Sequence, residues 1–154
     1  MVDANVGRLG KWLRMAGFDT VLAGFSDDNR MIRAALDEKR VLLTRDTQIF
    51  NRRIVSSGRL KVILIGNDQV QAQLCQVFTT LNLAAEIKPF TLCIECNRPL
   101  VPKTREEVKE LVPPYIFSTK THYMQCPQCY RIYWRGTHWE KMSKEIEKIT
   151  QKAC

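Results

Sequence analysis

The first half of the chain alternates short runs of β-branched and apolar residues with longer amphipathic stretches. The runs predict strands at 20–23, 41–44 and 62–66, and Met1-Val2 is the stub of another. The stretches predict helices at 5–16, 27–39, 47–57 and 69–81. Strands that alternate with helices in this way are typical of a parallel sheet flanked by helices, so the pattern predicts an α/β fold class.

One of these helices has a clear apolar face. Its apolar residues recur at helical spacing: Val70, Leu74, Val77, Phe78 and Leu81. We expect this face to pack on the sheet. The second half predicts a short helix at 106–112, ended by Pro113-Pro114, and a charged terminal helix at 137–152.

Two Cys-x-x-Cys pairs set the second half apart. Cys93 and Cys96 form one pair, and Cys126 and Cys129 form the other. Each pair can place two thiolates on one metal ion from a tight turn, and the two turns complete a tetrahedral zinc site. Four sulfur ligands leave no open coordination position, so we expect the zinc to be structural. The division predicts an α/β domain at 1–89 and a zinc ribbon at 90–154.

Two other uses of these cysteines are possible in principle. Disulfides fit poorly, because no secretory signal precedes the chain and the cysteines fall into metal-type pairs. A redox site of the thioredoxin kind needs one such motif after a strand, whereas this chain has two matched motifs. The interval between Cys96 and Cys126 is longer than in most zinc ribbons, which predicts that an inserted element fills it.

The charge of the chain favours a polyanionic partner. Lys and Arg number 24 against 16 Asp and Glu, a formal net charge of +8. Zinc on four thiolates would lower this to +6, because four negative charges arrive with two positive ones. Such a surplus favours nucleic acid, and the alternative is a solvated basic surface with no partner. No apolar run is long enough to cross a membrane, so we expect a cytoplasmic protein without membrane contact.

Acidic residues follow each predicted strand of the first half. They are Asp3, Asp27, Asp28, Asp46 and Asp68. Residues just past the carboxyl ends of parallel strands gather along one edge of the sheet, where ligands bind. Crowded carboxylates require a cation, and hard oxygen ligands suit Mg²⁺ or Mn²⁺, as in a two-metal phosphodiester hydrolase. The alternative is that each acidic residue only caps the helix that follows it.

Basic residues lie close to this edge in the sequence. In the helix at 5–16, Arg8, Lys11 and Arg14 share an arc opposite the apolar residues. This arc can hold a nucleic-acid backbone near Asp3, or it can be a solvated face. Arg45 is placed to contact a phosphate or to pair with a carboxylate.

Two further groups bear on the same chemistry. Thr44 ends its strand, and its hydroxyl can bind Asp46 or a metal-bound water. Three aromatic residues of the second half can stack on the bases of single-stranded RNA, although packing inside the protein is the commoner use of such residues. They are Tyr133, Trp134 and Trp139.

Four strings of residues extend over nearly the whole chain. They are Gly7-Arg8-Leu9-x-x-Trp12-Leu13-Arg14-x-x-Gly17-x-Asp19, Leu42-Leu43-Thr44-Arg45-Asp46, Cys93-x-x-Cys96-Asn97-x-Pro99-Leu100 and Cys126-Pro127-x-Cys129-x-Arg131-x-Tyr133-Trp134-x-Gly136-Thr137-His138. In this order they resemble the Mut-seven C-terminal ribonuclease domain family. The resemblance implies a PIN-like α/β nuclease fold joined to a zinc ribbon, which acts on RNA through acidic residues and a divalent metal. It also implies that Asp3 and Asp46 take the two surest acidic roles and Asp28 the third.

The chain departs from the family pattern at two points. Members usually have a full strand before the first aspartate, whereas only Met1-Val2 precedes Asp3 here. A strand this short would lose backbone hydrogen bonds, so we expect Asp3 to be loosely held. The fourth acidic position of PIN-like folds has only Asp27 and Asp68 as candidates.

Three classes of function remain open for this sequence. A metal-dependent ribonuclease with structural zinc and catalytic Mg²⁺ or Mn²⁺ is favoured by the acidic edge and the resemblance. A non-catalytic RNA-binding or protein-binding adaptor, built on a degenerate nuclease fold, would keep the zinc ribbon and the basic surface without needing the acidic residues. A DNA-binding zinc-ribbon regulator would leave the large α/β half without a use.

Overall fold

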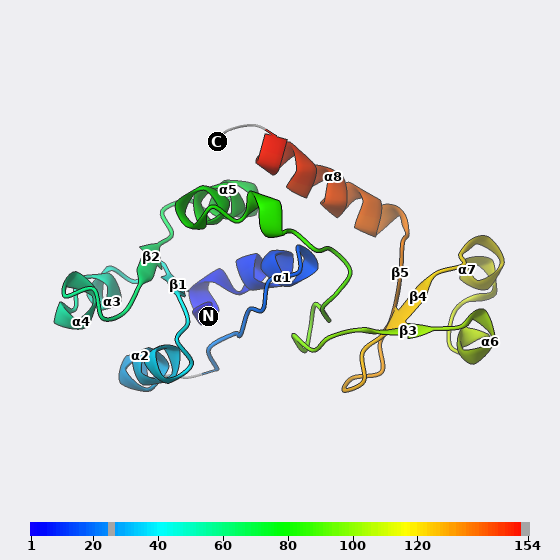
Figure 1. Cartoon of the computed structure of the whole chain (residues 1–154), viewed down its shortest axis with the longest axis horizontal. Coiled ribbons are helices and arrows are strands. Elements are labelled where there is room, and N and C mark those ends of the chain that lie inside the picture. Colours follow the sequence, from blue (N-terminus) through cyan, green and yellow to red (C-terminus); the bar gives the residue numbers. More distant parts are fainter. Residues whose placement is uncertain (25–26, 152–154) are drawn as a thin grey trace.

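A computed structural model describes residues 1–24 and 27–151 of the chain (Figure 1). Its first half contains a small parallel sheet. Strand β1 (Leu42–Thr44) pairs in parallel with β2 (Val62–Leu64), with Leu43 opposite Ile63. Val2 forms parallel bridges with Leu22 on one side and Leu43 on the other. Four parallel segments therefore lie side by side in the order 21–23, 1–3, β1, β2, and the predicted α/β fold class is confirmed.

The first segment is short, yet it is bonded on both sides. The amide of Val2 donates to Val21 O at 2.8 Å, and the amide of Ala23 donates to Val2 O at 2.8 Å. On the other side, the amide of Asp3 donates to Leu43 O at 2.9 Å. The expected loss of backbone bonds before Asp3 is therefore wrong, because this segment occupies a central position of the sheet.

The helices of the first half follow the predicted positions with one change. They are α1 (Gly7–Met15), preceded by the 3-10 turn η1 (Ala4–Val6), then α2 (Asp28–Asp37), α3 (Thr47–Phe50), α4 (Arg53–Ser56) and α5 (Val70–Leu81), with η2 (Ala84–Glu86) after it. The single helix expected at 47–57 is split, because Arg52 takes an extended conformation with ψ 146°. Between the predicted strand at 20–23 and α2, residues 25 and 26 lie outside the described part of the chain.

Helices cover both faces of the sheet. Leu43 and Ile63 pack with apolar residues of α1 and α5, whereas Leu42 packs with residues of α2 and α3. Successive side chains of a strand point to opposite faces, which explains why Leu42 and Leu43 belong to different clusters. The predicted packing face of α5 is confirmed, because Leu74 and Val77 are fully buried in the same cluster as Leu43.

The second half contains an antiparallel sheet of three short strands. These are β3 (Val101–Lys103), β4 (Tyr123–Gln125) and β5 (Ile132–Trp134), paired in that order. Two short helices, α6 (Arg105–Val108) and α7 (Pro114–Thr119), fill the interval between β3 and β4. The helix expected at 106–112 is present but shorter, because it ends at Val108. Pro114 then begins α7, since proline is well tolerated at the first helical position.

The last helix, α8 (Thr137–Gln151), returns to the first half and lies beside α5 (Figure 1). Its residues Met142 and Ile146 are buried in the same apolar cluster as α1 and α5. The helix follows the zinc ribbon in sequence but completes the core of the α/β half. Residue 152, the expected end of this helix, lies outside the described residues.

Within residues 1–24 and 27–151, no helix combines the length and the apolar character needed to cross a membrane.

Candidate functional site

Asp3 and Thr44 end neighbouring segments of the parallel sheet, and Asp46 follows Thr44 by two residues. The order of the segments reverses at this point, because the chain goes from 1–3 outward to 21–23 and then returns to β1 on the other side. In open α/β sheets, ligands bind outside the carboxyl ends of the strands at such a reversal. The topology therefore places Asp3 and Asp46 where a ligand site is expected.

The side chain of Thr44 connects the two acidic positions. Its hydroxyl donates to Oδ2 of Asp3 at 2.6 Å and accepts from the amide of Asp46 at 3.0 Å. Thr44 is fully buried, so solvent does not compete for either bond. The predicted link between Thr44 and Asp46 is present through the backbone amide, and the link to Asp3 was not predicted.

Asn5 is a second link that the sequence reasoning missed. Its Nδ2 donates to Oδ2 of Asp3 at 2.7 Å, and its Oδ1 accepts from the amide of Arg45 at 3.2 Å. Asn5 thus joins the segment after the first strand to the segment after β1. The signal in the sequence is the Asp-x-Asn spacing, which becomes informative only when the two strands are known to be neighbours.

Two of the acidic residues cap helices, as the alternative interpretation expected. Oδ1 of Asp46 accepts from the amides of Gln48 at 2.6 Å and Ile49 at 3.4 Å, at the start of α3. Asp27 accepts from the amide of Asn29 at 2.9 Å, at the start of α2. Asp46 nevertheless uses only one carboxylate oxygen in this way, and no hydrogen bond to Oδ2 is formed by the described residues.

The remaining two acidic residues pair with arginines. Asp28 accepts from Arg52 at 3.2 Å, and Asp68 pairs with Arg45 at 2.5 Å. The pair with Asp68 confirms one of the two roles expected of Arg45, which was to pair with a carboxylate. The side chain of Asp68 is largely exposed and that of Asp28 is partly exposed, so water screens both pairs.

The acidic residues do not form a compact cluster. Among the described residues, one group of three or more potential ligands has all its ligand atoms within 4.8 Å of one another, and this group is the four cysteines. The expected crowding of the carboxylates within one coordination sphere is therefore not seen. The structure brings Asp3 and Asp46 together through Thr44 and holds Asp28 on Arg52.

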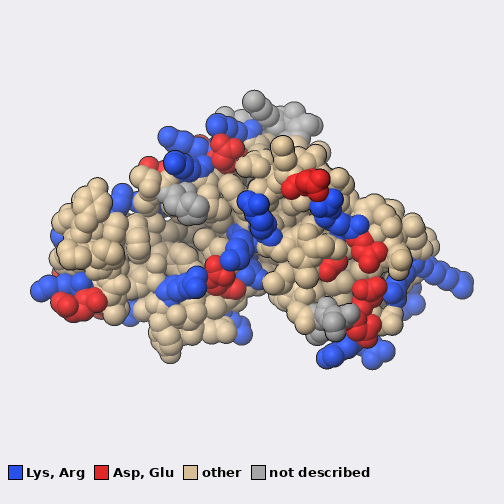
Figure 2. Space-filling view, turned by 180° about the vertical axis from the view of Figure 1, so that it is seen from behind, with Lys and Arg blue, Asp and Glu red and all other residues tan. Residues whose placement is uncertain are grey.

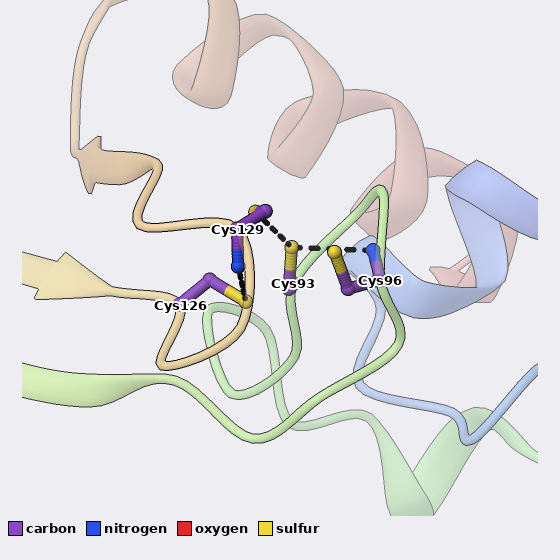
Figure 3. Close-up of side chains that lie close together, drawn as sticks. All are labelled: Cys93, Cys96, Cys126 and Cys129. Atoms are coloured by element: carbon purple, nitrogen blue, oxygen red, sulfur yellow. Dashed lines mark hydrogen bonds between the residues drawn. The ribbon is translucent and has the colours of Figure 1, made fainter.

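The four cysteines of the second half meet where the loops that carry the two Cys-x-x-Cys pairs face each other (Figure 3). The sulfurs of Cys93 and Cys129 are 3.7 Å apart. Four sulfurs at about 2.3 Å from one ion in a tetrahedron lie about 3.8 Å from each other. Cys93 and Cys126 are buried, whereas Cys96 and Cys129 are partly exposed. The donor set and the spacing fit a structural zinc site.

Both cysteine pairs are held by the same backbone turn. The amide of Cys93 donates to Arg98 O at 2.8 Å and that of Asn97 donates to Cys93 O at 2.9 Å. In the second turn, the amides of Cys126 and Tyr130 donate to Arg131 O and Cys126 O, each at 3.0 Å. We call residues 93–98 the first knuckle and residues 126–131 the second knuckle.

Hydrogen bonds to sulfur prepare one thiol for metal binding. Burial alone would raise the pKa of Cys93, but the Tyr133 hydroxyl at 3.1 Å and the amide of Cys96 at 3.3 Å outweigh it and lower this pKa to about 7. Burial, together with this contact, raises the pKa of Tyr133, so its hydroxyl keeps the proton that it donates. A thiolate is the form that binds zinc.

Arg14 joins the first knuckle to the α/β half. Its guanidinium donates to Thr20 O at 2.7 Å and to Ile94 O and Glu95 O, each at 2.8 Å. The residue is only 7% exposed. Arg14 was expected on an RNA-binding surface, and this expectation is corrected, because three backbone carbonyls surround its charge in the interior.

Asn97 adds a second connection between the first knuckle and the α/β half. Its Oδ1 accepts from the amide of Thr20 at 2.9 Å, and its Nδ2 donates to Asp19 at 2.5 Å. Burial would raise the pKa of Asp19, but the hydrogen bonds from Arg40 and Asn97 hold it below its usual value. Sequence reasoning missed this role of Asn97, because its partners lie in a distant loop.

The other residues of the basic arc are exposed. Lys11 pairs with Glu95 of the first knuckle at 2.9 Å, and this contact holds the pKa of Glu95 below its usual value. Arg8 lies one turn earlier on α1 and forms no ion pair with any described residue. Arg8 and Lys11 therefore remain on the surface, unlike Arg14.

The three aromatic residues considered for stacking are partly buried. Tyr133 contacts the sulfur of Cys93, Trp134 packs against Val108, Val112 and Tyr123, and Trp139 packs edge-on against Phe90 at 6.0 Å. These contacts favour the packing role over base stacking.

Comparison with known proteins gives one match. The sequence profile of the Mut7-C RNAse domain matches residues 1–146 of the 154 residues. No curated protein and no solved structure was found to be similar. The match covers both the α/β half and the zinc knuckles, as the resemblance of the four strings implied. The chain belongs to the Mut7-C RNAse domain family.

Proposed function

We propose that this protein is a metal-dependent ribonuclease that hydrolyses phosphodiester bonds of RNA. Asp3 and Asp46 are its principal metal ligands, and Asp28 is the third. The observation that carries the proposal is the link between Asp3 and Asp46 through the buried hydroxyl of Thr44, at the reversal point of the sheet. The family match supports a nuclease type of function.

Each principal ligand keeps one oxygen available. Asp3 uses Oδ2 for Thr44 and Asn5, and Asp46 uses Oδ1 for the first amides of α3. Fixing one oxygen of a carboxylate orients the other, so both side chains are prepared for a cation before it arrives. When bound there, Mg²⁺ or Mn²⁺ supplies an activated water and stabilises the leaving oxygen of the phosphodiester.

Basic residues near this edge hold the substrate. Arg8 and Lys11 lie on the exposed face of α1, which begins one turn after Asp3, and they are placed to contact RNA phosphates. Arg45 reaches a phosphate by leaving its exposed partner Asp68. When a metal ion binds, the carboxylate of Asp28 leaves Arg52 and binds the metal, because a divalent cation competes with a guanidinium for the carboxylate.

Zinc has a structural role in this proposal. The four cysteines of the two knuckles bind it. Hydrogen bonds of Arg14 and Asn97 then hold the first knuckle against α1 and the segment at 19–20. The chemistry at Asp3 and Asp46 thus depends on zinc only through the fold.

An RNA-cleavage assay with Mn²⁺ or Mg²⁺ tests the proposal. Asp46→Asn keeps the helix cap, since asparagine also caps helices, and Asp3→Asn keeps an acceptor for Thr44. We expect each variant to lose cleavage by about 100-fold or more while melting like the wild type. Asp37→Asn, at the exposed end of α2, is the matched control and should cut normally. If both site variants cut as well as the wild type, the activity does not come from this site.

A non-catalytic RNA-binding adaptor is the second candidate. It is favoured by the absence, among the described residues, of a compact carboxylate cluster and by the pairing of Asp28 and Asp68 with arginines. The same assay separates the two candidates. An adaptor binds RNA in both metal conditions and cuts it in neither.

A further inference from the structure

The tip of the second knuckle carries an exposed tyrosine in an unfavourable backbone conformation. Tyr130 is 71% exposed and has φ 60°, in the left-handed region. Its counterpart in the first knuckle is Asn97, with φ 59°. Asparagine and glycine adopt this conformation readily, whereas a bulky side chain does so at a cost.

Packing does not offset this cost for Tyr130. Phe90 also has a positive φ of 69°, but its ring packs against Trp139. The ring of Tyr130 makes no aromatic or cation-π contact with any residue that the structure describes. Backbone strain that is kept without a packing benefit is a reason to look for a function at that residue.

Two arginines belong to or contact the knuckle that carries this tyrosine. Arg131 follows it directly, and its side chain is 62% exposed. Arg98 donates to the side chain of Gln128 at 3.0 Å, which fixes it beside the second knuckle. No carboxylate neutralises Arg98 among the described residues, and it lines an open groove of about 700 Å³ between the first knuckle and the segment at 21–22.

The cations continue toward the proposed catalytic edge. Glu95 holds both Arg131 at 3.3 Å and Lys11 at 2.9 Å, so the second knuckle and α1 meet at this one acid. Arg8 lies one turn before Lys11 on the same helix, nearer to Asp3. Figure 2 shows basic side chains gathered in the middle of the molecule, beside the hollow between the two halves. Of the four cations between Tyr130 and Asp3, Arg131 and Lys11 pair with Glu95, whereas Arg98 and Arg8 form no ion pair with a described residue.

We propose that these residues form a track for single-stranded RNA, in which Tyr130 stacks on a base and Arg98, Arg131, Lys11 and Arg8 contact phosphates. The inference rests on the proposed function for the identity of the substrate. An exposed aromatic ring flanked by cations is the arrangement that binds unpaired nucleotides, whose base faces are accessible. A duplex hides those faces, so the track selects single strands.

Binding of a fluorescently labelled oligouridine, measured by anisotropy in the Asp46→Asn background without added divalent metal, tests the track. Tyr130→Asn suits the left-handed backbone, so we expect an unchanged or higher melting temperature together with roughly tenfold weaker binding. Tyr130→Phe keeps the ring and should bind like the parent. Tyr115→Ala removes a tyrosine that is 73% exposed on α7 and should also bind like the parent.

The dependence of affinity on salt tests the cations. Arg98→Gln and Arg131→Gln should each reduce the slope of log affinity against log salt by about 0.7, the value for one phosphate contact of a single strand. Arg33→Gln and Lys109→Gln, at exposed positions away from the track, should leave the slope unchanged.

Three results would overturn the track. One is that Tyr130→Asn binds RNA as tightly as the parent protein. Another is a lower melting temperature of this variant, which would show that the tyrosine stabilises the fold. The third is that duplex DNA competes for the protein as well as single-stranded RNA does at matched salt, which would show that charge alone explains the binding. Because this assay involves no cleavage, a negative binding result would not argue against the proposed ribonuclease site. Conversely, normal cleavage by Asp46→Asn would refute that site without affecting the binding result.

Discussion

Thr44 donates its hydroxyl hydrogen to Oδ2 of Asp3 at 2.6 Å, from the end of the neighbouring strand. The hydroxyl oxygen of Thr44 also accepts a hydrogen bond from the backbone amide of Asp46 at 3.0 Å. One buried hydroxyl therefore sets the positions of both proposed metal ligands. The side chain is small and β-branched, which suits a strand end, and valine would fill the same volume without the hydroxyl.

Thr44→Val is predicted to disturb the site more than the core. The buried amide of Asp46 and one oxygen of Asp3 lose a partner, so the free energy of unfolding should fall by about 1–3 kcal/mol. Manganese affinity and RNA cleavage should fall by about tenfold or more, because the Asp3 carboxylate loses one of its orienting bonds and the backbone at Asp46 loses its anchor. Thr80→Val, at an exposed position of α5, should alter neither property. Normal cleavage by Thr44→Val would show that the link is not needed.

Arg14→Lys is predicted to loosen the first knuckle. A lysine cannot reproduce the planar set of donors that contacts Thr20 O, Ile94 O and Glu95 O. Loss of two of these bonds at a buried charge should reduce the free energy of unfolding by about 3 kcal/mol, measured by urea denaturation. Zinc release to a chelator should also become faster. Arg33→Lys, at an exposed position of α2, is the control, and equal behaviour of the two variants would contradict the assignment.

Gly17→Ala is predicted to push the segment at Lys88 away from the end of α1. An added Cβ would lie 2.2 Å from Lys88 O, and Gly17 has φ 95°. Gly58 also has a positive φ of 74°, but an added Cβ there meets nothing within 4 Å. Gly58→Ala should therefore cost only the conformational term, about 1 kcal/mol, and Gly17→Ala should cost clearly more. Similar melting temperatures for the two variants would show that the chain near Lys88 moves freely.

Tyr133→Phe is predicted to change the pH dependence of zinc binding. Burial raises the pKa of Cys93, but hydrogen bonds from the Tyr133 hydroxyl and from backbone amides lower it to about 7, so the thiolate is favoured in the folded state above that pH and is lost as the pH falls through 7. Without the hydroxyl, burial raises this pKa, and more protons must leave when zinc binds. The variant should bind zinc more weakly than the wild type, and the difference in affinity should be larger near pH 7 than at pH 9. A constant difference between pH 7 and pH 9 would contradict the role of Tyr133.

Much of the fold could be predicted from local pattern. The spacing of Leu74 and Val77 predicted the packed face of α5, because these residues are close in sequence. The two Cys-x-x-Cys pairs are far apart in sequence but predicted one cluster, because four thiolates complete one tetrahedral zinc site. The split of 47–57 into α3 and α4 could not be predicted in this way. It depends on Arg52, whose side chain reaches across to Asp28 on α2.

The site was less predictable than the fold for a related reason. Helical spacing placed Arg14 with Arg8 and Lys11, but only the distant carbonyls of Ile94 and Glu95 explain why it is buried. Acidic residues after strands predicted the edge, yet the sequence does not say which of them cap helices and which leave an oxygen available. That distinction comes from the strand order, which is a property of contacts between distant residues.

A crystal structure of the protein grown with Mn²⁺, with an anomalous difference map at the manganese edge, tests the central claim most directly. The account predicts a manganese peak bonded to both Asp3 and Asp46, through the oxygens that Thr44 and the first amides of α3 leave available. A map in which manganese is bound elsewhere, while Asp3 and Asp46 keep only their present hydrogen bonds, would contradict it.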